Sequence, residues 1–387
     1  MTVSESESDR VHYLDNLRAL AMLLGVYLHG ALAYAEPSRS IWLATDPQGS
    51  RLVDASIWCI HLFRMNLFFL LAGYFAKLLI ERKGIGPFLR NRATRIALPF
   101  VSFWPVLWAA MAIVFVFALS YVKEPEGLLK AIVDAGRNPA ATPAGARYTT
   151  MHLWFLYYLM MFSLVGVIAV RWSRLRFDWL FRRSWLLAFL PLTLVAGIRG
   201  GGLPIAAPES FVPTWWPWAY YGVFYWFGWQ LRGRETLLER LQPWTWWLFL
   251  VSAILFVPHY LLLPVLRIDS LQQAVAAGSL TPSLFEAVLA AYLSASSTLT
   301  VLLSGRRLLI GASARLRFVA DASYWVYLVH LPVVLWLQTL LIPVALPMAV
   351  KLVSVVLGTL LVSFATYVVF VRYTPIGWML NGKRPFP

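Results

Sequence analysis

Long apolar segments recur along the whole chain and constrain its fold more than any other feature. About 20 predominantly apolar residues are enough for an α-helix to cross the hydrocarbon core of a bilayer. Ten such segments can be marked, at residues 17–35, 58–80, 96–119, 152–170, 184–199, 211–231, 244–263, 283–304, 322–344 and 348–371. They predict an all-α fold, a polytopic membrane helical bundle of about ten transmembrane helices.

The composition supports this class. Of the 387 residues, 60% are hydrophobic and 13% are charged, whereas about a quarter of the residues in soluble domains are charged. These values exclude a disordered chain and a soluble enzyme with an ordinary surface. The short alternating segments of a transmembrane β-barrel are absent. The single cysteine, Cys59, excludes an internal disulfide.

Basic residues are distributed unevenly between the two sides of the predicted bundle. If the N-terminus is cytoplasmic, 21 of the 33 Lys and Arg residues fall in cytoplasmic segments and 8 in the opposite segments. The positive-inside rule then predicts that both termini face the cytoplasm. We expect short cytoplasmic tails at residues 1–16 and 372–387, and one integral membrane domain at 17–371. The net charge of +15 is explained by these loops, so the expected surroundings are a lipid bilayer, with no nucleic acid partner.

The first apolar segment carries ionisable residues on one face. Asp15 and Arg18 are three residues apart and can pair. Arg18 and His29 are eleven residues apart, close to three full turns, so they share a stripe about 16 Å long. The alternative is an arginine at a helix end and an unrelated interior histidine.

Further polar residues are expected at the level of His29, near the outer ends of their segments. They are His61, Arg64, His152 and Glu286. A carboxylate and several imidazoles at one depth indicate acid–base chemistry near the outer surface. For Arg64 alone, a side chain that snorkels to the interface is an equally good interpretation. His330 lies about two turns inside the ninth segment. No H-E-x-x-H pattern or comparable spacing supports a metal site, so none is predicted.

Five sequence blocks, in order along most of the chain, carry a family resemblance. The first is Y-L-D-N-L-R-A at 13–19, with His29 completing an R-x10-H pattern. The others are F-R-M-N-L-F-F-L-L-A-G-Y-F at 63–75, F-L-R-N-R-A-T-R-I-A-L-P-F at 88–100, H-L-W-F-L-Y-Y at 152–158 and S-Y-W-V-Y-L-V-H-L-P at 323–332. Together they resemble the acyltransferase-3 family of integral membrane acyltransferases, and are most similar to its glucan-biosynthesis branch.

The resemblance implies an O-acyltransferase of the bacterial inner membrane. Such an enzyme transfers an acyl group, succinyl or acetyl, from cytoplasmic acyl-coenzyme A to a hydroxyl of an extracytoplasmic saccharide such as a periplasmic glucan. Acyl-coenzyme A is then a co-substrate, and no tightly bound cofactor is expected.

The same resemblance suggests roles for individual residues. His29 is the expected general base, with a transient acyl-histidine as the other possibility. Arg64 either stabilises the oxyanion or holds the distal carboxylate of a succinyl group. Glu286 or Asp15 is expected to orient or balance an imidazole. The remaining substrate-binding candidates are Arg18, Arg90, Arg92 and Arg95 for the anionic donor, and His61, His152, Tyr324 and His330.

Two other classes of function remain open. Buried Arg, His and Glu also mark the pathways of secondary transporters, here for a small anionic substrate, although no related halves with matching interrupted helices are found. A non-catalytic scaffold or lipid-flipping subunit is the third possibility, but it would not need His29 aligned with Arg18. Turnover of acyl-coenzyme A by the purified protein distinguishes the enzyme from both.

Overall fold

The computed structural model describes residues 3–137, 149–171, 181, 188–263, 281–311 and 313–382. Over these residues the fold is helical, with two isolated β-bridges. The longer helices are α1 (Val3–Ala31), α2 (Arg51–Lys83), α3 (Ile85–Arg92), α4 (Leu98–Tyr121), α5 (Gly127–Arg137), α6 (Trp154–Arg171), α9 (Trp216–Leu231), α11 (Thr245–Leu262), α13 (Leu284–Leu308), α14 (Ala314–Leu341) and α15 (Met348–Phe370). The short elements are η1 (Leu32–Tyr34), η2 (Ser38–Ile41), η3 (Ala93–Ala97), η5 (Met151–Leu153), η7 (Leu190–Leu194), α8 (Val195–Gly201), α10 (Glu235–Leu241), η8 (Gln242–Trp244) and α16 (Pro375–Asn381).

The long helices confirm the prediction of an all-α polytopic membrane bundle. Eight of those described are long and apolar enough to cross a membrane. The first two of these spans are His12–Tyr34 and Arg51–Lys83. All eight coincide with predicted apolar segments, so eight of the ten predicted segments form such helices. The segment predicted at 211–231 forms the 16-residue helix α9. Part of the segment predicted at 184–199 lies outside the described residues, and its described part forms the short helices η7 and α8.

Both ends of α2 have local sequence causes. The hydroxyl of Ser50 accepts a hydrogen bond from the Leu52 N–H and so caps the N-terminus. The helix stops at Gly84, which has a φ of 82°, a conformation that favours glycine. The chain then turns into α3. At the N-terminus of the chain, α1 already begins at Val3, so residues expected as a tail are helical.

Glycines allow α2 and α9 to pack backbone to backbone. A Cβ at Gly73 would collide with the carbonyl of Tyr225, and one at Gly228 with the carbonyl of Leu70. Small residues at such crossings are typical of membrane helix pairs, because close approach gains van der Waals contact without a hydrophobic driving force. The glycine of the L-A-G-Y block therefore fixes α9 against α2.

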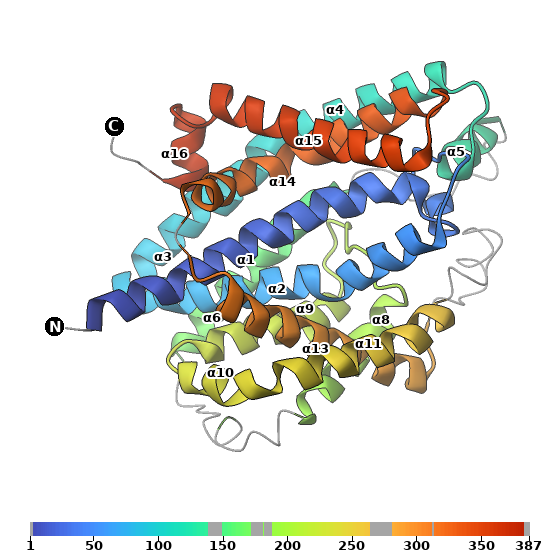
Figure 1. Cartoon of the computed structure of the whole chain (residues 1–387). Helices are drawn as coiled ribbons and strands as arrows, with labels where there is room; N and C mark the ends of the chain where they lie inside the picture. The colour runs from blue at the N-terminus through green and yellow to red at the C-terminus, as the bar shows by residue number, and fades with distance from the viewer. Residues whose placement is uncertain are drawn as a thin grey trace.

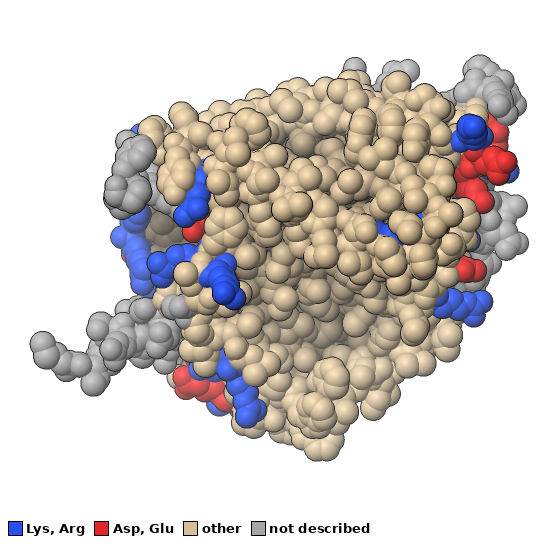
Figure 2. All heavy atoms as spheres, turned by 45° about the horizontal axis from the view of Figure 1, so that its top comes forward, with Lys and Arg blue, Asp and Glu red and all other residues tan. Residues whose placement is uncertain are grey.

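The bundle has two distinct ends. In Figure 1, α1 begins and α16 ends at the left, which we call the terminal end, and α5 lies at the opposite, distal end. Helix α1 runs from the terminal to the distal end, and α2 packs against it on the way back. Figure 2 shows charged side chains of both signs at the terminal and distal ends, with Lys and Arg prevailing at the terminal end, and a broad, almost uncharged surface between them. This distribution is that of a membrane-embedded bundle.

Candidate active site

A large cavity runs through the bundle between α1, α2, α6 and α14. Its volume is about 960 Å³. Arg18 and His29, three turns apart on α1, both line it, as the stripe in the sequence predicts. Asp15 forms the predicted ion pair with Arg18, at 3.4 Å, but does not line the cavity.

Basic side chains line the terminal end of the cavity. They are Arg18, Arg82, Lys83, Arg92 and Arg95. The guanidinium of Arg92 lies over the Phe88 ring, 4.9 Å from its centroid. Arg95 donates a hydrogen bond to the carbonyl of Asn381, at 3.0 Å. This arrangement provides several fixed cations at one mouth, which suits an anionic, phosphate-bearing ligand.

A π-helical turn, η3, brings two of these arginines to the cavity. It lies between α3 and α4 and includes Arg95. Its backbone is held from α14, where the Tyr324 hydroxyl donates to the Arg95 carbonyl at 2.7 Å. Turns of this type occur frequently at functional sites. Arg90 is exposed and does not line the cavity, so the structure separates it from its neighbours Arg92 and Arg95.

Three histidines meet towards the distal end. The ring centroids of His29 and His330 are 5.2 Å apart, and those of His330 and His152 are 5.6 Å apart. They come from three different helical elements, α1, α14 and η5. Met151, directly before His152, has a φ of 51°, which is uncommon for a residue other than glycine. Such strained positions cluster at functional sites.

Backbone carbonyls of α14 fix the tautomers of two of these rings. Nδ1 of His330 contacts the carbonyls of Tyr327, at 2.8 Å, and Val326, at 3.1 Å, and Nε2 of His152 contacts that of Leu328, at 2.9 Å. A carbonyl oxygen only accepts, so each of these nitrogens donates. The neutral rings then keep lone pairs on Nε2 of His330 and Nδ1 of His152. The latter atom is buried and has no partner in the described part of the chain.

Trp42 and Gln338 position His29. The Trp42 ring stacks on the His29 ring, with centroids 5.6 Å apart and planes inclined by 25°. Gln338 accepts from the Trp42 indole N–H, at 2.8 Å, and its amide donates to the carbonyls of His29 and Gly30, at 2.9 Å each. Nδ1 of His29 is buried and unpartnered among the described residues. The His29 ring is therefore held by stacking and by its backbone, and a nitrogen remains available for proton transfer.

Arg64 lies one helical turn from His29. A Cβ built on Gly25 would be 2.6 Å from a terminal guanidinium nitrogen of Arg64, so this side chain packs flat against α1. Arg64 lines the cavity, and its Nε is buried without a partner in the described residues. A buried cation beside an imidazole is suited to stabilise negative charge that develops there.

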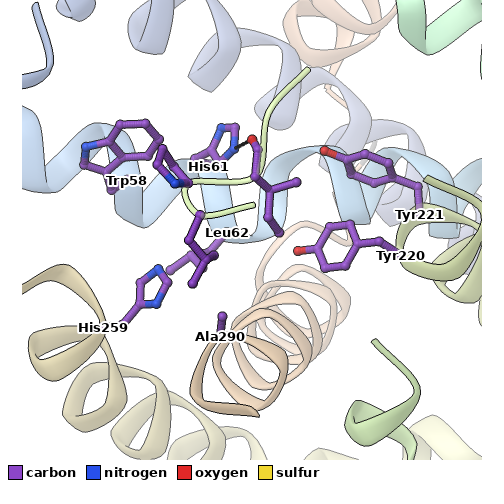
Figure 3. A pocket seen from close by; sticks show the side chains of 10 residues that line it. Trp58, His61, Leu62, Tyr220, Tyr221, His259 and Ala290 are labelled. Atoms are coloured by element: carbon purple, nitrogen blue, oxygen red, sulfur yellow. Dashed lines mark hydrogen bonds between the residues drawn. The ribbon is translucent and has the colours of Figure 1, made fainter. Parts of the chain in front are cut away.

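His61 separates the cavity from a smaller pocket. Its Nε2 donates to the carbonyl of Ile205, at 2.9 Å, which Figure 3 shows as a dashed line. His259 reaches into the small pocket from α11 and does not line the large cavity. The small pocket has room for about one water molecule, at about 10 Å³.

Glu286 is not brought to the cavity. It forms a capping box at the start of α13, where its carboxylate accepts from the backbone N–H and the hydroxyl of Ser283, at 2.8 Å each. Its position three residues after a serine is the sequence signature of this motif. No group of three or more His, Cys, Asp and Glu in the described residues is arranged to hold a metal ion.

Three residues of the site were not singled out from the sequence: Gln338, and two that line the cavity, Trp42 and Glu209. Gln338 interrupts an apolar span and is 1% exposed, so a search for uncharged polar residues in spans would have found it. Trp42 and Glu209 lie in segments between long helices, where no periodic pattern marks a residue.

Comparison of the sequence with known protein families identifies the family of the chain. The model of the acyltransferase domain matches residues 11–368. The chain belongs to this acyltransferase family. The expectation of a membrane O-acyltransferase is thereby confirmed.

Curated relatives of this acyltransferase match over almost their full length. The chain is 24% identical to glucans biosynthesis protein C of Salmonella paratyphi B, covering 99% of this chain and 97% of the relative. The same protein of Salmonella schwarzengrund is 23% identical over the same shares. No solved structure gives a significant match.

Proposed function

We propose that this acyltransferase moves an acyl group from acyl-coenzyme A at the terminal end to a hydroxyl of a saccharide, such as a glucan, at the distal end. The observation that carries the proposal is a single cavity lined by arginines at one end and by histidines towards the other. The name of the relatives, glucans biosynthesis protein C, supports a glucan as acceptor.

The donor has chemistry that fits the terminal end. Coenzyme A carries several phosphate charges, and each phosphate pairs well with a guanidinium. Arg92 and Arg95 are fixed by neighbouring groups before any ligand arrives. The acyl thioester then extends along the cavity from Arg18 towards His29, a path of about 16 Å along α1.

His29 is the proposed general base. It takes the proton of the acceptor hydroxyl while the hydroxyl oxygen attacks the thioester carbonyl. Arg64, packed against Gly25 one turn away, stabilises the negative charge on that carbonyl oxygen. The carbon–sulfur bond then breaks, and the coenzyme A sulfur receives the proton back from the His29 imidazolium. The products are the acyl ester and free coenzyme A.

The proposed location is the bacterial inner membrane, with both termini in the cytoplasm. Two observations support it. The basic residues of the loops favour the side of the termini, 21 to 8. The basic end of the cavity lies at the same end of the bundle as the start of α1, so the donor mouth opens towards the compartment that contains acyl-coenzyme A.

A sided assay tests the function. The full chain is reconstituted in vesicles, a glucose oligosaccharide is enclosed, and radiolabelled succinyl- or acetyl-coenzyme A is added outside. We expect labelled oligosaccharide inside with the wild type, and none with His29→Gln. His12→Gln, on the same helix but outside the cavity lining, is the matched control and should remain active. Donor uptake without ester formation would instead support the transporter.

A further inference from the structure

A loop at the distal end of the cavity contains a carboxyl group to which the proposed mechanism gives no role. Residues 203–210, the distal loop, follow α8, and five of them line the cavity, Glu209 among them. His61 lies next to both this loop and the histidine end, because its Nε2 bonds to the loop carbonyl of Ile205.

The backbone of the distal loop is fixed on both sides of Glu209. The Glu209 carbonyl accepts from the backbone N–H of Thr150, at 2.7 Å, and from its hydroxyl, at 2.9 Å. The Glu209 N–H donates to the carbonyl of Ala207, at 2.9 Å, and Ser210 forms an isolated bridge with Thr149. Thr150 is two residues before His152, so the loop is attached to the element that carries one of the three histidines.

Among the described residues, the carboxyl of Glu209 has no partner of opposite charge. It forms no ion pair with any described residue, and burial alone raises its pKa. Glu209 is half-buried and lines the cavity, so its carboxyl is placed to hydrogen-bond a ligand there. A ligand that fits must bring hydrogen-bond donors. An anionic group would be repelled, which excludes the phosphates of the donor from this end.

We propose that Glu209, held in place by the distal loop, hydrogen-bonds hydroxyl groups of a neutral, polyhydroxylated acceptor and forms an acceptor subsite at the histidine end of the cavity. Neighbouring hydroxyls of a sugar can donate to the two oxygens of one carboxylate, or exchange donor and acceptor roles with a protonated carboxyl. An ammonium group would also pair with an ionised carboxylate, so an amino-sugar oligosaccharide is the competing acceptor in the test, and the neutral acceptor follows from the glucan of the proposed function.

The inference rests on the proposed function, and kinetics with the purified full chain tests it. The donors are acetyl- and succinyl-coenzyme A, and the acceptor probe is a linear glucose oligosaccharide. For Glu209→Gln we expect the KM for the oligosaccharide to rise on the order of tenfold, and for Glu209→Ala more, as expected for loss of a hydrogen bond to a charged group. The KM for the donor and the rate of donor hydrolysis without acceptor should stay within about twofold.

Two controls separate the possible failures. Glu124→Gln changes an exposed glutamate outside the cavity lining and should leave all constants unchanged. If the wild type transfers acyl groups to the oligosaccharide but the Glu209 variants keep its KM, only the subsite is wrong. If the wild type transfers nothing to it, the proposed function fails and the subsite fails with it. A preference for a glucosamine oligosaccharide that disappears in Glu209→Gln would contradict the neutral acceptor.

Discussion

The two ends of the cavity hold their polar side chains in different ways. At the terminal end the arginines lie against an aromatic ring or a carbonyl, as Arg92 does with Phe88 and Arg95 with Asn381. The Nε of Arg92 has no partner among the described residues and can meet a ligand. Towards the distal end the rings of His152 and His330 are buried, and each has one nitrogen committed to a backbone carbonyl.

This difference suits the terminal end to binding the donor and the histidine end to proton transfer. A site for a charged, flexible donor needs several cations, and the exact direction of each is less important. A site for proton transfer needs a lone pair at a defined place, and fixing one nitrogen of an imidazole defines the other. We therefore expect substitutions of the cavity-lining arginines at the terminal end to change the KM for the donor, and substitutions of His29 and His330 to change kcat.

The largest effect is expected at His29. His29→Gln keeps hydrogen bonding but removes a base, so kcat should fall by roughly 10²- to 10⁴-fold with little change in the KM for the donor. The measurement is steady-state transfer by purified protein, with His12→Gln as control. A His29→Gln variant with most of its kcat would mean that the ring only positions substrate, and the division between the two ends would fail.

The next effect is expected at His330. Its ring adjoins that of His29, with the two ring centroids 5.2 Å apart, and its Nε2 carries the lone pair. It can stabilise a protonated His29 by accepting a hydrogen bond. Loss of one such charge-assisted bond corresponds to about 10- to 100-fold in kcat. His330→Gln should show this loss, whereas His259→Gln, a buried histidine outside the large cavity, should not. Equal losses in both would indicate a general packing defect.

The sequence predicts more of the fold than of the site. Eight long helices appear where apolar segments predict them, because length and hydropathy are local properties of the chain. The stripe of Arg18 and His29 on α1 also follows from local geometry. The segment of α9 reads as a full span, but its described helix has only 16 residues. Its length and its contact through Gly73 depend on tertiary packing.

The limits of prediction within the site have a similar cause. Arg90 and Arg92 are indistinguishable in a basic sequence block, and only the path through α3 and the π-helical turn decides which one lines the cavity. Glu286 is at the depth expected for chemistry, yet local capping accounts for it. Gln338 acts on residues about 300 positions away in the chain, a relation that no spacing in one sequence reveals.

At the terminal end, Arg92 and Arg90 give a sharper test. Arg92→Gln should raise the KM for acyl-coenzyme A on the order of tenfold, as expected for one lost phosphate contact, and leave kcat nearly unchanged. Arg90→Gln removes the same charge two residues away from an exposed position and should change the KM by less than about twofold. Equal effects of the two variants would mean that the basic end acts only through its net charge. High salt would then abolish both effects together.

The smallest effect is expected at Glu286. The sequence predicts it at the same membrane depth as His29, but it does not line the cavity. Its carboxylate accepts two hydrogen bonds from Ser283 at the start of α13. Gln can take the same position in a capping box, so Glu286→Gln should leave kcat, both KM values and the unfolding temperature close to those of the wild type. Glu286→Ala should lower only the unfolding temperature, since removal of a cap interaction costs about 1 kcal/mol. A loss of kcat in Glu286→Gln at unchanged unfolding temperature would contradict the capping assignment. It would also mean that the carboxylate of Glu286 takes part in acyl transfer. The imidazoles and Arg64 would then not be the only catalytic groups at the histidine end.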